Sequence, residues 1–485
     1  MTTLKVLFLA SEADPLIKVG GLGDVAGSLP YALQGLSSEW VGGMNIDIKL
    51  VIPFHAAIRP KLEKFEKIAA FDVPNSEGAI PATVYRTEIN QLTIYLIAGP
   101  PFGKGEPVYT ADSYRDGNKY TFFSLAAMAL PQYIDWIPDV IHANDWHTAV
   151  APYAAKLLPA FSYLNTTSSV LTIHNLPFMG AGAEKALEEF GIPPSLDPGL
   201  PDWARLIPLP LGLVAADRIV AVSSSYADEI LTPEFGCSLE TFLQSRQETV
   251  TGILNGLDQT SWDPSSDRNI LQPFGPQSLL NRQKNRDALL QELNLENNPE
   301  IPLMIIISRM DQQKGIDLAI EALQQVVNLP WQAVILGTGA PLLEAACQLL
   351  QENYPERVRA ILKFDANLAR RMYAGGDMIL MPSRYEPCGL AQMISMRYGC
   401  IPVARATGGL KDTIHDFLSP GATGFLFKEA SATALAETLV RAISEFHDQS
   451  GWQKLQLCGM RTDFSWQRSA IAYAHLYQTL QEQVL

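Results

Sequence analysis

Short apolar runs alternate with helix-like patterns along most of this 485-residue sequence, and that alternation restricts the possible folds most strongly. Apolar runs of roughly four to eight residues bounded by turn signals are typical of strands buried on both faces of a parallel sheet. Between two such runs, Ile316, Ile320, Leu323 and Val327 recur at helical spacing. Repeated units of strand, helix and strand predict an α/β fold with doubly wound sheets.

The predicted strands fall into two series. The first contains residues 6–10, 46–52, 93–98, 140–143, 170–173 and 218–222, and the second contains 303–308, 333–336, 360–364, 378–381 and 401–404. The polar stretch between the series carries Asp263-Pro264, a turn signal. We therefore expect two Rossmann-like domains, over residues 1–257 and 258–462. An amphipathic helix within 463–485 is expected to pack back on the first domain.

The composition excludes several classes of protein. With 36 Lys and Arg against 51 Asp and Glu, the formal net charge of −15 argues against a nucleic-acid binder. The five cysteines include no Cys-x-x-Cys pair and favour a reducing compartment. No apolar run approaches the roughly 20 residues of a membrane helix. We expect a cytoplasmic protein without membrane partners, or a protein of the plastid stroma in a eukaryote, although no transit peptide is evident.

The segment Lys18-Val19-Gly20-Gly21-Leu22-Gly23-Asp24 lies between the first strand and an apolar helix expected to begin at Val25. Glycines let the backbone approach an anion, and a helix N-terminus supplies unpaired N–H groups. Lys18 adds a positive charge. The alternative interpretation is a tight turn whose glycines allow close packing.

Two cations mark the start of the second series. Arg309 and Lys314 lie in the loop that follows strand 303–308 and opens a helix. Doubly wound folds bind ligands at this carboxyl end of the strands. Arg can grip phosphate oxygens as a fork, and Lys supplies compact charge. An anion site is therefore predicted, with an ordinary solvated loop as the alternative.

Two later loops repeat this arrangement. Glu386 follows strand 378–381 and could accept hydrogen bonds from hexose hydroxyls, although capping alone also explains an acid there. Cys388 has no His near it in sequence and is interpreted as a packing residue. Gly408 and Gly409, after strand 401–404, provide a second glycine-rich contact for phosphate or sugar.

The histidines His142, His147 and His174 follow or end two strands of the first series. Their spacing matches no zinc pattern, and the run Asp145-Trp146-His147 is equally a sugar-binding combination. We therefore expect no metal.

Together these segments resemble the bacterial and plastid glycogen and starch synthases, a retaining glycosyltransferase family (family 5). The resemblance runs through nearly the whole chain in the family's order and rests on residues 18–24, 142–147, 172–175, 232–236, 255–258, Arg309 with Lys314, 386–390 and 407–410. It implies two Rossmann-like domains facing across a cleft, the GT-B architecture. It also implies transfer of glucose from ADP-glucose to the non-reducing end of an α-1,4-glucan or maltooligosaccharide, with release of ADP and without a cofactor or metal.

The resemblance assigns roles to individual residues. The catalytic set it implies is Glu386, His174, Asp145, Lys18, Arg309 and Lys314. The donor-binding set is Lys18, Gly20, Gly21, Asn255, Arg309, Lys314, Phe364, Glu386, Cys388, Gly389, Leu390, Thr407, Gly408 and Gly409. Among these, Arg309, Lys314 and Lys18 are expected on the diphosphate, Asn255 on a glucose hydroxyl and Phe364 against adenine. The loop at 232–236 is expected on the acceptor side.

The sequence departs from the family pattern at two positions. Val19 stands where many relatives have Thr, and Ile394 stands eight positions after Glu386, where related transferases carry a second acid. Two rival functions remain open at this point. One is a UDP-glucose-dependent transferase of the same architecture, such as a sucrose or trehalose synthase. The other is a catalytically silent glucan-binding protein.

Overall fold

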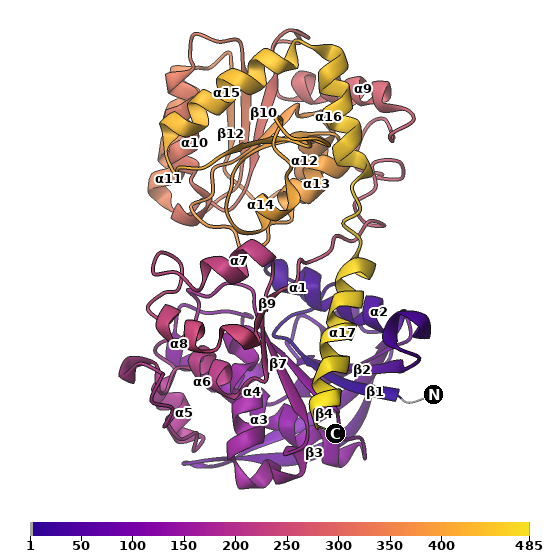
Figure 1. Ribbon diagram of the computed structural model, residues 1–485, viewed down its shortest axis with the longest axis vertical. Helices are drawn as coiled ribbons and strands as arrows, with labels where there is room; N and C mark the ends of the chain where they lie inside the picture. Colours follow the sequence, from indigo (N-terminus) through magenta and orange to yellow (C-terminus); the bar gives the residue numbers. More distant parts are fainter. Residues whose placement is uncertain (1–2, 485) are drawn as a thin grey trace. The chain divides into compact units, whose positions relative to one another are not determined.

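The computed structural model describes residues 3–484, which form two compact units (Figure 1). The first unit contains the chain up to Gly256 together with the C-terminal segment from Trp466, and the second contains Leu257–Ser465. The predicted boundaries lay after residues 257 and 462. The chain therefore leaves the first unit one residue earlier, and returns three residues later, than the sequence suggested.

The first unit is built on a nine-stranded sheet in the order β3-β4-β5-β2-β1-β6-β7-β8-β9. The strands are β1 (Thr3–Leu9), β2 (Asn45–Pro53), β3 (Glu66–Asn75), β4 (Gly78–Ile89), β5 (Leu92–Ala98), β6 (Val140–Asn144), β7 (Ser168–Ile173), β8 (Arg218–Ala221) and β9 (Val250–Gly252). All neighbours pair in parallel except β3 with β4 and β4 with β5, which are antiparallel. The antiparallel hairpin was not predicted, because β3 and β4 are only partly buried and lack continuous apolar runs.

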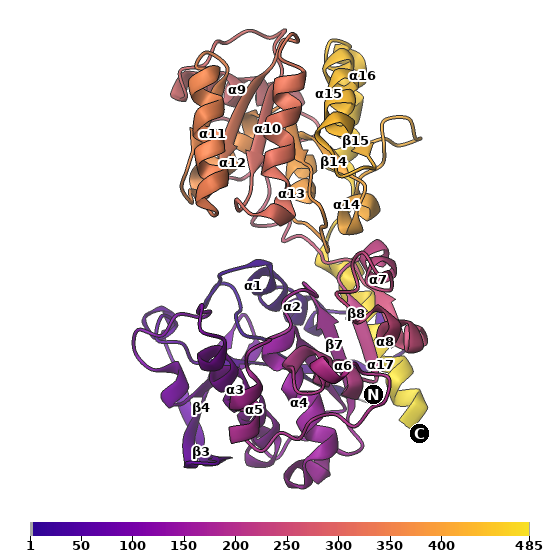
Figure 2. The same ribbon diagram turned by 90° about the vertical axis from the view of Figure 1, so that its left-hand side faces the viewer.

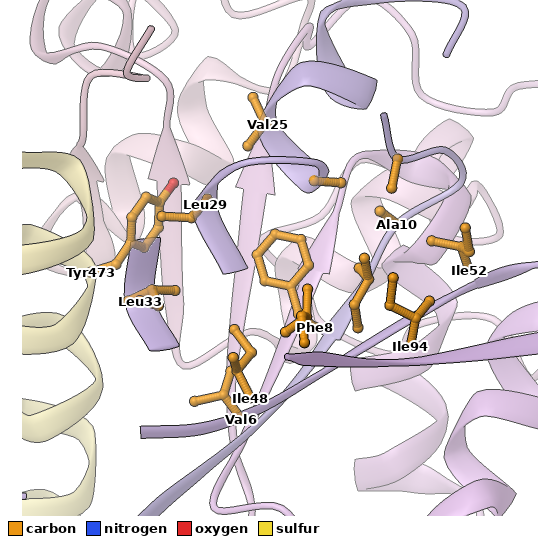
Figure 3. Close-up of a cluster of buried hydrophobic side chains, with 14 of the residues drawn as sticks. Val6, Phe8, Ala10, Val25, Leu29, Leu33, Ile48, Ile52, Ile94 and Tyr473 are labelled. Carbon is orange, nitrogen blue, oxygen red and sulfur yellow. The ribbon is translucent and has the colours of Figure 1, made fainter. Parts of the chain in front are cut away.

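Both faces of this sheet are covered. The helices are α1 (Gly21–Ala26), α2 (Leu29–Gln34), α3 (Ser113–Tyr133), α4 (Trp146–Leu157), α5 (Glu184–Glu189), α6 (Pro208–Ala215), α7 (Ser224–Glu229), α8 (Glu240–Ser245) and α17 (Trp466–Val484). Val6 and Phe8 point from β1 into a cluster with α1, α2 and α17 (Figure 3). Leu7 and Leu9 point into a second cluster on the opposite side, with α3 and α4. This alternation follows from the two-residue period of a strand.

Helices α3, α4, α5 and α6 lie side by side on one face of the sheet (Figure 2). Helix α17 packs against α2 on the other face. On that face, the His142 ring at β6 bonds through Nδ1 to the Tyr477 hydroxyl of α17 (2.6 Å). Its Nε2 bonds to the Thr172 hydroxyl of β7 (2.7 Å). The C-terminal helix is therefore part of the first unit's core.

The second unit is built on a six-stranded, entirely parallel sheet in the order β12-β11-β10-β13-β14-β15. Its strands are β10 (Leu303–Ile307), β11 (Gln332–Leu336), β12 (Val358–Ile361), β13 (Met378–Met381), β14 (Ile401–Arg405) and β15 (Phe425–Phe427). Its helices are α9 (Arg282–Glu292), α10 (Ile316–Gln325), α11 (Pro341–Asn353), α12 (Ala366–Gly375), α13 (Ala391–Arg397), α14 (Gly408–Thr413), α15 (Ala432–Phe446) and α16 (Gln449–Arg461). The predicted doubly wound α/β architecture is thus present in both units.

Two local predictions were wrong. The apolar residues Val25, Ala26, Leu29 and Leu33 form two short helices, α1 and α2, because Gly27 and Pro30 interrupt the pattern and α1 already begins at Gly21. The strand predicted over 360–364 is β12, which ends at Ile361. Among residues 3–484, no helix is long and apolar enough to cross a membrane.

Candidate active site

In the first unit, the predicted polar residues follow three neighbouring parallel strands. Lys18 lies in the segment after β1, Asp145 directly follows β6, and His174 directly follows β7. Carboxyl ends of adjacent parallel strands lie at one edge of a sheet, where doubly wound folds bind ligands. The fold therefore places these three segments on one edge.

The glycine loop is held by a residue that the sequence did not single out. The buried Glu12 carboxylate accepts hydrogen bonds from the backbone amides of Val19 and Gly20. The Gly20 nitrogen lies 3.1 Å from Oε1 and 3.2 Å from Oε2. Lys18 pairs with Asp24 in the first turn of α1. The Gly20 amide is therefore already used within the loop, whereas its expected role was an approach to the donor diphosphate with Gly21.

Tyr109 completes this arrangement. Its hydroxyl donates to Glu12 Oε1 (3.0 Å) and lies 2.9 Å from Ser11 Oγ. Burial raises the pKa of Glu12, and the two amides and the Tyr109 hydroxyl oppose that rise. Burial also keeps the pKa of Tyr109 well above its usual value, so the phenol remains a donor. Glu12 is recognisable in sequence only as an acid just after a strand, and Tyr109 lies far from it along the chain.

Asp145 and His174 are brought together. Asp145 Oδ1 accepts the His174 backbone N–H at 2.7 Å. Asp145 has a positive φ of 54°, a conformation that is strained for a residue with a side chain. Desolvation raises the pKa of Asp145 to about 7, although the His174 and Asn175 amides lower it. This carboxyl is therefore placed to titrate near neutral pH.

The His174 ring has a defined tautomer. Asn144 donates its side-chain N–H to the Leu9 carbonyl (2.9 Å), so its amide oxygen is the atom that faces His174 Nε2 at 2.9 Å. Nε2 must then carry the proton, which leaves a lone pair on Nδ1. Desolvation lowers the pKa of His174 to about 3, so the ring is neutral at physiological pH.

Of the three histidines that the sequence singled out, the remaining two, His142 and His147, are core residues. His142 bonds to Tyr477 and Thr172, as described above, and His147 packs its ring against Tyr109, Tyr120 and Trp146. Burial lowers the pKa of both His142 and His147 to about 3. No group of three His, Cys, Asp or Glu side chains within residues 3–484 could hold a metal ion.

In the second unit, three adjacent strands bring together the second set of predicted residues. Arg309 and Lys314 follow β10, Glu386 follows β13, and Gly408 follows β14. Lys314 Nζ lies 2.7 Å from both oxygens of Glu386. The Ser383 hydroxyl donates to Glu386 Oε2 at 2.9 Å. Glu386, only 4% exposed, is thus neutralised by Lys314 and oriented by Ser383.

Arg309 differs from Lys314 in its surroundings. Its side chain is 64% exposed and lies 3.3 Å from Asp311, whose carboxylate caps the turn by accepting the Lys314 amide at 3.1 Å. An exposed ion pair of this kind is weak, so the guanidinium remains free to bind another anion. The loop therefore carries one accessible cation, Arg309, and a second cation, Lys314, that is ion-paired with Glu386.

Glycines in these loops allow close approach. Gly315 has φ +66°, and a Cβ there would lie 2.1 Å from the Pro382 carbonyl oxygen. A Cβ on Gly408, with φ +43°, would lie 2.0 Å from the Glu386 carbonyl oxygen, and the Gly409 amide donates to that oxygen at 3.0 Å. Packing of the loops that carry Lys314 and Glu386 therefore requires these glycines.

The remaining predicted residues lie as follows. Cys388 is buried, Gly389 has φ +75°, and Leu390 and Thr407 directly precede α13 and α14. Asn255 lies in the first unit, where its buried Oδ1 has no hydrogen-bond partner in the described chain. Phe364, in the loop after β12, is 88% exposed.

Comparison with known proteins identifies the family. Residues 5–245 match the family model of the starch synthase catalytic domain, and residues 287–452 match that of glycosyl transferases group 1. The glycogen synthase of Aromatoleum aromaticum is 38% identical, over 98% of this chain and 96% of its own length. The chain belongs to the glycogen and starch synthase family. The glycogen synthase of Thermotoga maritima, 37% identical over 98% of both chains, agrees with this.

Solved structures confirm the GT-B fold. The catalytic domain of starch synthase IV from Arabidopsis thaliana, bound to ADP and acarbose, matches 99% of this chain and 100% of its own with a TM-score of 0.87 and 29% identity. Sucrose-phosphate synthase from Thermosynechococcus elongatus shares the fold, with a TM-score of 0.61 and 18% identity. This glycogen/starch synthase homologue is a glycosyltransferase that transfers glucosyl units in glycogen or starch synthesis.

Proposed function

We propose that this chain transfers glucose from ADP-glucose to the non-reducing end of an α-1,4-glucan, with retention at the anomeric carbon and release of ADP. The observation that carries this proposal is the Lys314–Glu386 pair beside Arg309, at the carboxyl ends of β10 and β13. Cations are required to bind a diphosphate, and a fixed hydrogen-bond acceptor is required to orient a hexose. The starch synthase IV relative, bound to ADP and acarbose, supports the choice of nucleotide and glucan.

The leaving diphosphate gains negative charge as its bond to glucose breaks. Arg309 and Lys314 are proposed to offset that charge, together with Lys18 of the first unit. Glu386 is proposed to accept hydrogen bonds from the donor glucose while Lys314 holds the carboxylate in place. Because the proposed residues are divided between the units, we propose that catalysis uses both.

Retention does not require a glycosyl-enzyme in this proposal. Retaining glycosidases place a free carboxylate nucleophile about 5 Å from a general acid. Here both Glu386 oxygens already bind Lys314, and one also binds Ser383. We propose that the acceptor oxygen attacks C1 on the face from which the diphosphate departs. The C1–O bond to ADP breaks, the new glycosidic bond forms, and a diphosphate oxygen takes the acceptor's proton.

Other residues are proposed to define the donor. Phe364 offers an exposed ring for adenine stacking, and Asn255 offers a buried amide oxygen to a glucose hydroxyl. Asp145 and neutral His174 are proposed to lie beside the reacting glucosyl group. The cations at the phosphate make a metal ion unnecessary in this scheme.

The test is release of ADP from ADP-glucose with and without glycogen. We expect glycogen-dependent release that persists in EDTA and yields chains sensitive to an α-1,4-specific glucosidase. Faster reaction with UDP-glucose and a small sugar acceptor would support the rival sucrose or trehalose synthase. Glycogen binding without release of either nucleotide would instead indicate a silent binding protein.

A further inference from the structure

The Glu12 carboxylate has a position that the proposed chemistry does not explain. It follows β1, is only 1% exposed, and lies behind the loop that carries Lys18. Its hydrogen bonds go to the Val19 and Gly20 amides and to the Tyr109 hydroxyl. Consecutive backbone N–H groups in a glycine-rich turn form a nest for an anion. In this protein, the nest already holds an anion supplied by the chain.

We propose that Glu12 is a positioning residue for the diphosphate clamp: its carboxylate fills the backbone nest from within and fixes the direction in which Lys18 leaves the loop. This inference rests on the proposed function, in which Lys18 stabilises the departing diphosphate. It makes the Lys18 side chain, and not the Val19 and Gly20 amides, the group that contacts the diphosphate, because those two amides are occupied.

The surroundings leave the carboxylate little freedom. A Cβ on Gly23 would lie 3.2 Å from Glu12 Oε2 and 3.0 Å from Lys18 Cγ, so the carboxylate and the Lys18 stem both pack closely against Gly23. On the other side, Tyr109 holds Oε1 and is itself held by Ser11. Each Glu12 oxygen thus faces hydrogen-bond donors. The side-chain amide of a glutamine at this position would turn its own N–H toward one of those donors.

The experiment is a double-mutant cycle between two residues of the first unit. We would measure kcat and the KM for ADP-glucose and for glycogen in wild type, Glu12→Gln, Lys18→Ala and the double variant. Glu12→Gln is expected to lower kcat about tenfold or more while the KM for glycogen stays unchanged. In the Lys18→Ala background, Glu12→Gln should cost less than about twofold, because the side chain that it positions is already gone.

The matched control is Asp217→Asn. Asp217 is a carboxylate of the same unit that also accepts a backbone amide, that of Ser169 at 2.7 Å, but it precedes β8 and lies near the opposite end of the strands. Asp217→Asn is expected to lower the Tm without changing kcat. Its effects should add to those of Lys18→Ala.

The inference is overturned if Glu12→Gln folds and keeps wild-type kcat, or if its kinetic cost is the same with and without Lys18. If Glu12→Gln does not fold, Glu12→Asp, which keeps the charge on a shorter side chain, is measured in both Lys18 backgrounds with the same criterion. Failure of the proposed function is a separate outcome, because wild type itself would then release no ADP with glycogen.

Discussion

At the residue scale, Arg309 and Lys314 should have similar kinetic effects and different effects on stability. Loss of either cation should lower kcat/KM by roughly 10²- to 10³-fold, the scale of losing a charge stabiliser in the transition state. Lys314→Ala should also lower the free energy of unfolding by on the order of 3 kcal/mol, since it leaves the buried Glu386 charge unpaired. Arg309→Ala removes only an exposed pair and should leave stability almost unchanged.

Activity assays and denaturant unfolding of both variants check this contrast. Lys363→Ala, which removes an exposed ion pair with Asp365 in the same unit, is the matched control and should change neither quantity. A Lys314→Ala variant that keeps more than half of the wild-type rate would show that Lys314 pairs with Glu386 without acting on the diphosphate.

Asp145 should make stability depend on pH. Its pKa is raised to about 7 in the folded protein, so between the unfolded value near 4 and pH 7 the folded state binds more protons than the unfolded state. Its contribution to stability is therefore full at low pH and is lost as pH rises through 7. Because asparagine does not ionise, the Asp145→Asn variant does not lose this stability as the pH rises. Its amide oxygen still accepts the hydrogen bond from the His174 backbone amide.

Thermal unfolding of wild type and Asp145→Asn at pH 5 and pH 8 measures the effect. The Tm of the variant minus that of wild type should become more positive at pH 8. The buried histidines, whose lowered pKa values act in the opposite direction, are present in both proteins and cancel in this difference. A difference that is independent of pH would show that Asp145 titrates normally.

At the element scale, the turn between β10 and α10 should not tolerate a side chain at Gly315. Alanine there would keep a left-handed φ and place Cβ 2.1 Å from the Pro382 carbonyl, pushing the Lys314 turn away from the Glu386 loop. We expect a loss of stability above about 1 kcal/mol and a large loss of kcat/KM. Gly421→Ala is the control, because it has φ +70° but no atom within 4 Å of the new Cβ. It should show the backbone strain alone, with normal activity.

Elements set by local pattern were predictable, and those set by distant partners were not. Most strands of both sheets were confirmed, because parallel strands covered on two faces are continuously apolar. The break between α1 and α2 depends on Gly27, whose Cβ would lie 2.4 Å from the Asp14 carbonyl, a contact that no helical pattern reveals. The candidate site follows the same rule. Glu386 and Lys314 stand at strand ends and could be found, whereas Glu12 acquires its role from Tyr109, remote in sequence.

At the scale of the whole molecule, the chain completes its first unit with its last helix. Tyr473, Tyr477 and Leu480 of α17 are buried with residues of β1, β2 and α2. A chain ending at Ser465 would expose that core and would remove the Tyr477 partner of His142 Nδ1. The second unit, Leu257–Ser465, keeps every one of its own strands in such a chain.

Calorimetry should therefore separate the two units. We expect truncation after Ser465 to abolish the transition of the first unit or to lower its Tm strongly, while the transition of the second unit persists. Tyr477→Phe should give a milder form of the same effect, about 1–3 kcal/mol in the first unit only, because it orphans one buried nitrogen. His475→Ala, on the exposed side of the same helix, should change neither transition. If truncation shifted both transitions equally, the C-terminal helix would be stabilising the molecule as a single cooperative body and not as part of one unit.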